Sequence, residues 1–137
     1  MLARIRSAAV LGIDAYLVDV ETDIASGLPT FVTVGLPQGA VKEGRDRVAA
    51  ALANTGFTFP LRRVTINLAP ADVPKTGSAF DLPIALGILA ATEQIAGERL
   101  PRIAVLGELG LEGAVRPVRG ALPVAPPTVP PTNRLGF

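Results

Sequence analysis

Residues 64–91 read VTINLAPADVPKTGSAFDLPIALGILAA and contain the two patterns that decide the fold. Every second residue from Val64 to Leu68 is apolar, which is typical of a strand with one buried face. Residues 80–91 are almost wholly apolar and too long for a typical strand, and Pro83 falls where the first turn of a helix tolerates proline. The stretch therefore predicts a strand over 62–68, a loop, and then a buried helix.

The residues before this stretch predict three strands and a second helix. β-branched and aromatic residues indicate strands over 8–13, 16–20 and 31–34. Apolar residues at helical spacing predict a helix over 39–54. Its i,i+4 charge pairs are Lys42 with Asp46 and Glu43 with Arg47. We interpret these charges as a solvated helix face.

The buried helix and the loop before it each contain one notable residue. Asp81 stands at the start of the helix, where a carboxylate caps the first turn or complements the helix dipole. Gly77 lies where the chain must turn sharply into the helix, so we expect a backbone conformation that favours glycine.

The residues after the helix predict a hairpin and then a change of composition. Residues 103–109 and 114–118 flank a turn-rich joint. The expected order is β-β-β-α-β-α-β-β, which favours a layered α/β or α+β domain with its helices packed on one sheet. Four prolines follow within 126–137 and cannot continue a helix or a central strand. We therefore expect a folded domain over 1–125 and a proline-rich tail.

Composition excludes several classes of function. The net charge of +1 lacks the positive field of a stand-alone nucleic-acid-binding module. The chain has no Cys and no His, which excludes thiol and imidazole catalysis and leaves carboxylates, hydroxyls, Lys and Arg. No run approaches the roughly 18 apolar residues of a membrane span, so we expect a soluble, cytoplasmic protein without a membrane partner.

Three segments, 2–37, 64–91 and 104–125, together resemble the amino-terminal, Lon-peptidase-like domain of the ComM/YifB family of magnesium-chelatase-like AAA+ ATPases. The order of the segments, their spacing and their amino-acid sequences all agree with that family. The resemblance implies the ribosomal protein S5 domain 2-like fold. The family continues beyond residue 125 with a further helix, more sheet and the ATPase module, so we expect this domain to be incomplete, through truncation or a shifted reading frame.

The resemblance also implies a function. In the family this domain precedes an AAA+ module, and the assembled protein is a ring-forming motor linked to DNA branch migration in recombination and natural transformation. The chain alone is then a non-catalytic accessory domain without a cofactor, since ATP and magnesium bind in the missing module. The implied partners are that module, in a homo-oligomeric ring, and DNA. A small independent DNA-binding module is an alternative.

The resemblance to Lon makes catalysis testable by residue, because Lon-type peptidases use a Ser nucleophile activated by a Lys. The family's motifs place that Ser at Ala79 and that Lys at Leu122, so both are missing. A shifted dyad of Ser78 and Lys75 would form a residual hydrolase. It needs a buried Lys75 with a lowered pKa, whereas we expect its loop to be wet. The chain also lacks the Gly-Lys step of a phosphate-binding P-loop.

No catalytic, cofactor-binding or metal-binding residue is therefore expected. If the domain touches DNA, its cations are the candidates, because guanidinium and ammonium groups bind phosphates. The candidates are Arg62, Arg63, Lys75, Arg116 and Arg119. Plain solubilising surface charge is the alternative for each of them.

Overall fold

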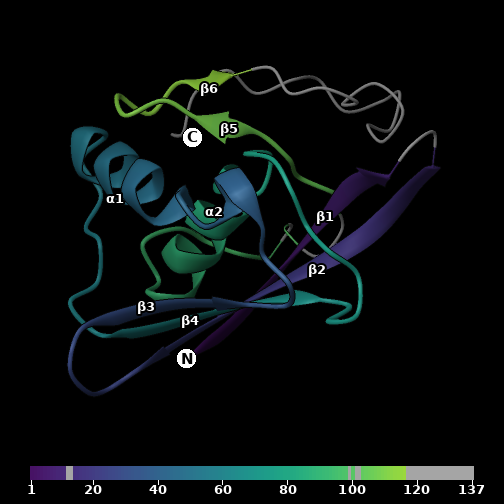
Figure 1. The fold of residues 1–137 in the computed structure, drawn as a ribbon. Helices are drawn as coiled ribbons and strands as arrows, with labels where there is room; N and C mark the ends of the chain where they lie inside the picture. The colour runs from purple at the N-terminus through teal and green to yellow at the C-terminus, as the bar shows by residue number, and fades with distance from the viewer. Residues whose placement is uncertain (12–13, 99, 101–102, 117–137) are drawn as a thin grey trace.

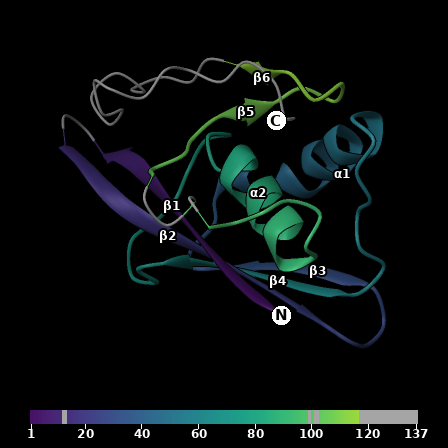
Figure 2. The same ribbon diagram turned by 180° about the vertical axis from the view of Figure 1, so that it is seen from behind.

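The computed structural model describes residues 1–11, 14–98, 100 and 103–116. They form a four-stranded sheet, two helices on one side of it, and a short hairpin beyond the helices (Figures 1 and 2). The prediction of a mixed α and β fold with helices packed on a sheet is confirmed. The expected tail over 126–137 and the predicted contact residue Arg119 lie outside the described residues.

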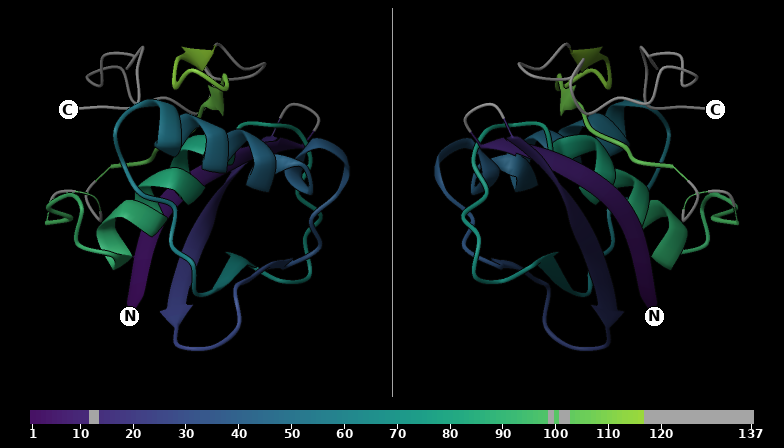
Figure 3. Two further views of the ribbon diagram at one scale, coloured as in Figure 1. Left: turned by 90° about the vertical axis from the view of Figure 1, so that its left-hand side faces the viewer. Right: turned by 90° about the vertical axis from the view of Figure 1, so that its right-hand side faces the viewer.

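The sheet is built around two central strands. Its strands are β1 (Leu2–Leu11), β2 (Asp14–Ala25), β3 (Thr30–Val34) and β4 (Arg63–Ala69), in the order β1-β2-β4-β3. β2 is antiparallel to both of its neighbours, whereas β3 runs parallel to β4. The long β1–β2 hairpin twists away from the shorter β3–β4 pair (Figure 3). Among the described strands, β1 and β3 are thus the two edges of this sheet.

The predicted helix over 39–54 is divided into two pieces. A short 3-10 helix η1 (Gly39–Val41) comes first, and α1 (Gly44–Asn54) follows. The carbonyl of Ala40 accepts a hydrogen bond from Glu43 N at 3.2 Å and another from the Arg47 guanidinium at 2.6 Å. A side chain thus takes an acceptor that a continuous helix would use for its own backbone.

Helix α2 (Asp81–Ala91) is the buried helix that the sequence predicts. All of its residues except Ala90 are buried. It packs on β1 and β2 and against α1. A helix that is apolar all round needs such cover on every side, which the sheet, α1 and the following hairpin supply.

The predicted hairpin is present but short, with β5 (Glu108–Leu109) antiparallel to β6 (Val115–Arg116). The strand expected over 103–109 is divided between two partners. Ala104 bridges to Arg6 on the edge of β1, and Val105 N donates to the Arg6 carbonyl at 2.8 Å. The hairpin prediction was therefore too long, because its first half pairs with the main sheet.

The core lies between the sheet and α2. Ile5, Val20 and Leu68 are neighbours across β1, β2 and β4, and all three are buried. Thr22 is also buried there, and its hydroxyl has no hydrogen-bond partner in the described part of the chain. A Cβ atom at Gly87 of α2 would collide with that hydroxyl, so glycine lets the helix approach β2 closely.

The loop between β4 and α2 runs beside the segment that follows β3. Lys75 N donates to the Leu36 carbonyl at 3.0 Å, and Gln38 N donates to the Lys75 carbonyl at 2.9 Å. The Tyr16 hydroxyl donates to the Pro74 carbonyl at 3.0 Å. This loop is therefore bonded to the body of the domain through its backbone.

Gly77 lies in this loop and Gly35 in the segment after β3, and we expect the two glycines to respond differently to substitution. Both have positive φ, +100° at Gly35 and +84° at Gly77, as the sequence predicts for Gly77. A Cβ atom at Gly77 meets nothing, so Gly77→Ala should cost about 1–2 kcal/mol of backbone strain. A Cβ atom at Gly35 collides with the Leu68 carbonyl, so Gly35→Ala should lower the free energy of unfolding considerably more. Urea titration of both variants measures the difference, and equal losses would contradict this packing.

Candidate functional site

The predicted cationic contacts do not form one surface. Arg63 is the first residue of β4 and Arg62 precedes it, whereas Arg116 lies in β6, beyond the helices (Figure 1). All three are exposed. Arg116 forms a 3.4 Å ion pair with Glu112, whereas no ion pair involves Arg62 or Arg63 within the described ranges. Of the predicted contact residues that the structure describes, Arg62 and Arg63 are the two that are adjacent and exposed.

Lys75 is not a surface residue, and its prediction as a DNA contact was wrong. Its exposed fraction is 0%. Its ammonium donates to the carbonyl of Gly35 at 2.9 Å and to the carbonyl of Pro70. Loss of contact with water lowers the pKa of Lys75. The loop itself is mostly exposed, as expected, but its backbone pairs with the segment after β3 and the Lys75 side chain is buried beneath it.

Burial also changes the argument about the shifted dyad of Ser78 and Lys75. A buried lysine with a lowered pKa meets one requirement of a general base. Its ammonium, however, points to two backbone carbonyls, and no hydrogen bond joins it to Ser78 among the contacts of the described residues. The Ser78 carbonyl accepts from Asp81 N at 3.2 Å at the entry to α2. In this geometry Lys75 holds the loop to the end of β3.

A buried ion pair joins the two helices, and the sequence reasoning missed it. The Asp81 carboxylate is 1% exposed and accepts two hydrogen bonds from the Arg47 guanidinium, at 2.6 and 3.0 Å. It also accepts a bond from Leu109 N at 3.1 Å. Burial raises the pKa of Asp81, and the bonds from Arg47 and Leu109 pull it down.

This pair corrects two predictions. Asp81 does not cap α2, because Phe80 occupies the cap position and no side chain caps the helix there. Asp81 stands instead in the first turn, which agrees with the alternative prediction that it complements the helix dipole. The predicted Glu43–Arg47 pair is present at 3.4 Å, but the Arg47 side chain is only 19% exposed, so it does not belong to a solvated face. The sequence contained one signal for this ion pair, the single carboxylate at the start of an apolar helix. A buried charge needs a partner of opposite charge.

The outer face of the sheet carries a second set of charges that the sequence reasoning missed. Glu21 on β2 accepts from Arg4 on β1 at 2.9 Å and from Asn67 on β4 at 2.8 Å. Arg6 and Asp19 pair at 3.8 Å. These pairs follow from strand register, which brings together residues far apart in the sequence.

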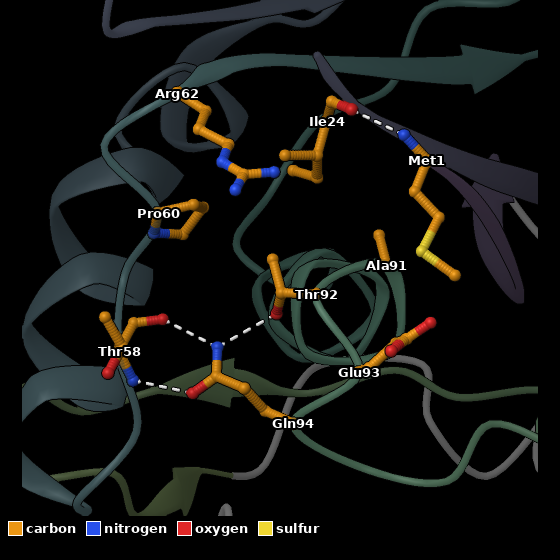
Figure 4. A pocket seen from close by; sticks show the side chains of 9 residues that line it. All are labelled: Met1, Ile24, Thr58, Pro60, Arg62, Ala91, Thr92, Glu93 and Gln94. Atoms are coloured by element: carbon orange, nitrogen blue, oxygen red, sulfur yellow. Dashed lines mark hydrogen bonds between the residues drawn. The ribbon is translucent and has the colours of Figure 1, made fainter. Parts of the chain in front are cut away.

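A hollow of about 480 Å³ lies beside the end of α2 (Figure 4). Gln94 spans one side of it, accepting from Thr58 N and donating to the Thr58 carbonyl, each at 2.8 Å. Arg62 is the predicted contact residue that lines it. The full lining is Met1, Ile24, Thr58, Pro60, Arg62, Ala91, Thr92, Glu93 and Gln94. The lining contains side chains of both charges, Arg62 and Glu93.

Two further features are absent from the described part of the chain. It contains no cluster of three or more Asp, Glu, His or Cys residues that could hold a metal ion. None of its helices is both long and apolar enough to cross a membrane.

Arg47 allows a matched test of its two acidic partners. Asp81→Ala should lower the free energy of unfolding by about 2–4 kcal/mol, because it leaves a largely buried guanidinium without its carboxylate. Glu43→Ala should cost less than about 0.5 kcal/mol, because Glu43 is 71% exposed and its pair is screened by water. Chemical denaturation of both variants gives the comparison. A loss below about 1 kcal/mol for Asp81→Ala is typical of a lost helix cap, and it would contradict the stabilising role of the buried ion pair.

The two lysines allow a direct test of the buried amine. Lys42 is exposed and Lys75 is fully buried, and the chain has no other lysine. A brief treatment of the native protein with an amine-acylating reagent should modify Lys42 and leave Lys75 unmodified, because an amine reacts through its accessible neutral form. Denaturation before treatment should make both residues react. Peptide mass spectrometry measures the two sites, and equal labelling in the native state would contradict the burial of Lys75.

Comparison with known proteins gives the family. The family model described as subunit ChlI of Mg-chelatase matches residues 20–129. YifB of Salmonella typhimurium is 49% identical over 121 residues, which cover 88% of this chain and 24% of YifB. Competence protein ComM of Haemophilus influenzae is 48% identical over 122 residues, 89% of this chain and 24% of ComM. Rv2897c of Mycobacterium tuberculosis is 49% identical over 122 residues, with the same coverage.

The chain therefore spans about a quarter of the length of these relatives. The predicted ComM/YifB resemblance is confirmed by the YifB and ComM matches. Because the family model matches most of its residues, the chain belongs to the Mg-chelatase subunit ChlI family, in its ComM/YifB-like branch.

Proposed function

We propose that this chain is the amino-terminal accessory domain of a ComM/YifB-type AAA+ protein and couples to its ATPase ring without catalysing a reaction. The observation that carries the proposal is the 48% identity to ComM over only 24% of ComM's length. A match confined to a quarter of a longer protein supports the role of one domain within it. In this proposal ATP and magnesium bind to the remainder of the protein, and the homo-oligomeric ring drives branch migration of DNA in recombination and transformation.

The Lon-peptidase-like, ribosomal protein S5 domain 2-like fold is part of the same proposal. Its support is the sheet order β1-β2-β4-β3, with one parallel pair at β3 and β4 and the helices on one side. A non-catalytic role is supported by Ala79 at the position of the Lon serine. It is also supported by the hydrogen bonds of Lys75, which go to backbone carbonyls.

A residual Ser/Lys hydrolase is the second candidate, because burial lowers the pKa of Lys75 as a general base requires. To act, Lys75 would have to leave the carbonyls of Gly35 and Pro70 and reach Ser78. Covalent labelling of Ser78 by an acylating serine-hydrolase probe would favour this candidate over the accessory domain.

We assign candidate DNA contact to Arg62 and Arg63. These residues are adjacent and exposed, and Arg62 lines the hollow beside α2. Lys75 is excluded by its burial. Two cations on a domain of net charge +1 supply only a small part of an affinity for DNA. In this proposal, other parts of the ring supply most of the contacts with DNA.

A chimera tests the accessory role. Replacing the matching quarter of Haemophilus influenzae ComM with this chain should restore transformation by chromosomal DNA, whereas ComM lacking that quarter should not support it. The physical reason is that the domain supplies packing and orientation, which a 48% identical domain preserves. Transformation frequency and the ATPase rate of the purified chimera are the measurements.

Two variants of the chimera serve as controls. Asp81→Ala, which breaks the helix pair, should reduce complementation through loss of the fold. Arg62→Glu with Arg63→Glu should keep the fold and weaken DNA binding by the ring, most strongly at low salt. A folded chimera that hydrolyses ATP and fails to transform would contradict the proposal.

A further inference from the structure

The hollow beside the end of α2 has the size of a small-molecule site and walls that are joined to each other. Its volume of about 480 Å³ lies within the roughly 300–1,000 Å³ of ligand pockets. Gln94 joins the two walls, because its side-chain nitrogen donates to the Thr58 carbonyl at 2.8 Å and to the Thr92 hydroxyl at 2.9 Å (Figure 4). The shape of the hollow is therefore set by the chain itself.

Glu93 stands on the α2 side of the hollow, at a position that normally belongs to glycine. Its φ is +60°, and it directly follows the helix cap Thr92. Glu93 N donates to the Ala90 carbonyl at 3.1 Å, and Gln94 N donates to the Leu89 carbonyl at 2.8 Å, which is the Schellman pattern of a helix end. Glycine adopts this backbone conformation without strain, whereas glutamate does not. The helix thus ends through backbone bonds that do not need the Glu93 side chain.

The charge of Glu93 is unfavourable for the helix as well. The C-terminal end of a helix carries a partial negative charge, which a cation stabilises and a carboxylate does not. The last turn of α2 contains no basic residue. Among residues 1–11, 14–98, 100 and 103–116, no cation forms an ion pair with Glu93. Strain of this kind is typical of binding sites, and the helix end and the carboxylate together form a subsite for a cation.

Arg62 lies on another side of the hollow and supplies the opposite charge (Figure 4). It is exposed, and in the described ranges its guanidinium pairs neither with Glu93 nor with any other carboxylate. The two charges of the hollow are thus separate. The apolar part of the lining consists of Met1, Ile24, Pro60 and Ala91.

We propose that the hollow binds a linear ω-amino acid, a small molecule with an ammonium group at one end, methylene groups in the middle and a carboxylate at the other end. Its ammonium group lies at Glu93 and the end of α2, its carboxylate at Arg62, and its methylene groups on the apolar lining. Apolar walls with a few placed polar groups are the usual composition of ligand pockets. The inference is independent of the proposed coupling function, because it concerns a small molecule bound by this chain alone.

The single methionine of the chain provides a direct test, because Met1 lines the hollow. With an isotope-labelled methionine methyl group, titration of the full chain with ε-aminocaproate should shift its NMR signal in a saturable way. Caproate and hexylamine each lack one of the two charges, and each should bind at least about fivefold more weakly, the factor expected for one exposed ion pair. Equal affinity for the three compounds, or no saturable shift, would overturn the proposal.

Glu93→Gly separates binding from stability. Loss of the carboxylate should weaken binding of ε-aminocaproate at least about fivefold and leave the weaker binding of caproate unchanged. The melting temperature should rise in the same variant, because glycine removes the backbone strain. Binding of ε-aminocaproate that survives this substitution, or a lower melting temperature, would overturn the assignment of Glu93 to a ligand.

Arg62→Gln tests the opposite end of the hollow. It should weaken binding of ε-aminocaproate by a similar factor and leave the binding of hexylamine unchanged. Arg63→Gln is the matched control, because Arg63 is the adjacent exposed arginine and does not line the hollow. This control should bind ε-aminocaproate as the unmodified chain does. Equal losses in the two arginine variants would contradict a site at the hollow.

Discussion

The Asp81 carboxylate receives hydrogen bonds from two separate parts of the domain, and the layer of helices depends on it. It accepts from Arg47 of α1 and from Leu109 N of β5, while it stands itself in the first turn of α2. Arg47 extends the connection to the Ala40 carbonyl of η1. Gly44 leaves room beside the carboxylate, since a Cβ atom there would lie 3.1 Å from Asp81 Oδ1. One buried charge therefore sets the relative position of both helices and the hairpin.

Elements with strong local patterns were predictable from the sequence. The alternation in β4 and the apolar run of α2 place both elements to within one residue of the structure. Boundaries that depend on distant residues were not predictable. Helix α1 begins late because Arg47 takes the Ala40 carbonyl, and the first half of the predicted hairpin strand pairs with β1. In both cases a contact from elsewhere in the chain outweighs the local pattern.

The candidate site was less predictable than the fold, for the same reason. Lys75 has the local sequence of an exposed loop, yet its ammonium reaches the Gly35 carbonyl, 40 positions away in the chain. Arg47 and Asp81 are 34 positions apart. Strand order decides that Arg4 and Asn67 share the carboxylate of Glu21. Composition identifies which charges exist, and the tertiary structure decides which of them remain available to a partner.

The connections of the sheet have very unequal costs in chain entropy. Only two positions separate β1 from β2 in the sequence. The ten residue pairs of these two strands are therefore close together along the chain. The parallel partner of β3 arrives only after residues 35–62, which include α1. By the logarithmic dependence of loop closure on length, the longer connection costs about 2 kcal/mol more. The hairpin can thus form locally, whereas β3 joins the sheet only when the α1 crossover is in place. Ordering of β3 at the edge of the sheet is therefore tied to formation of the α1 crossover.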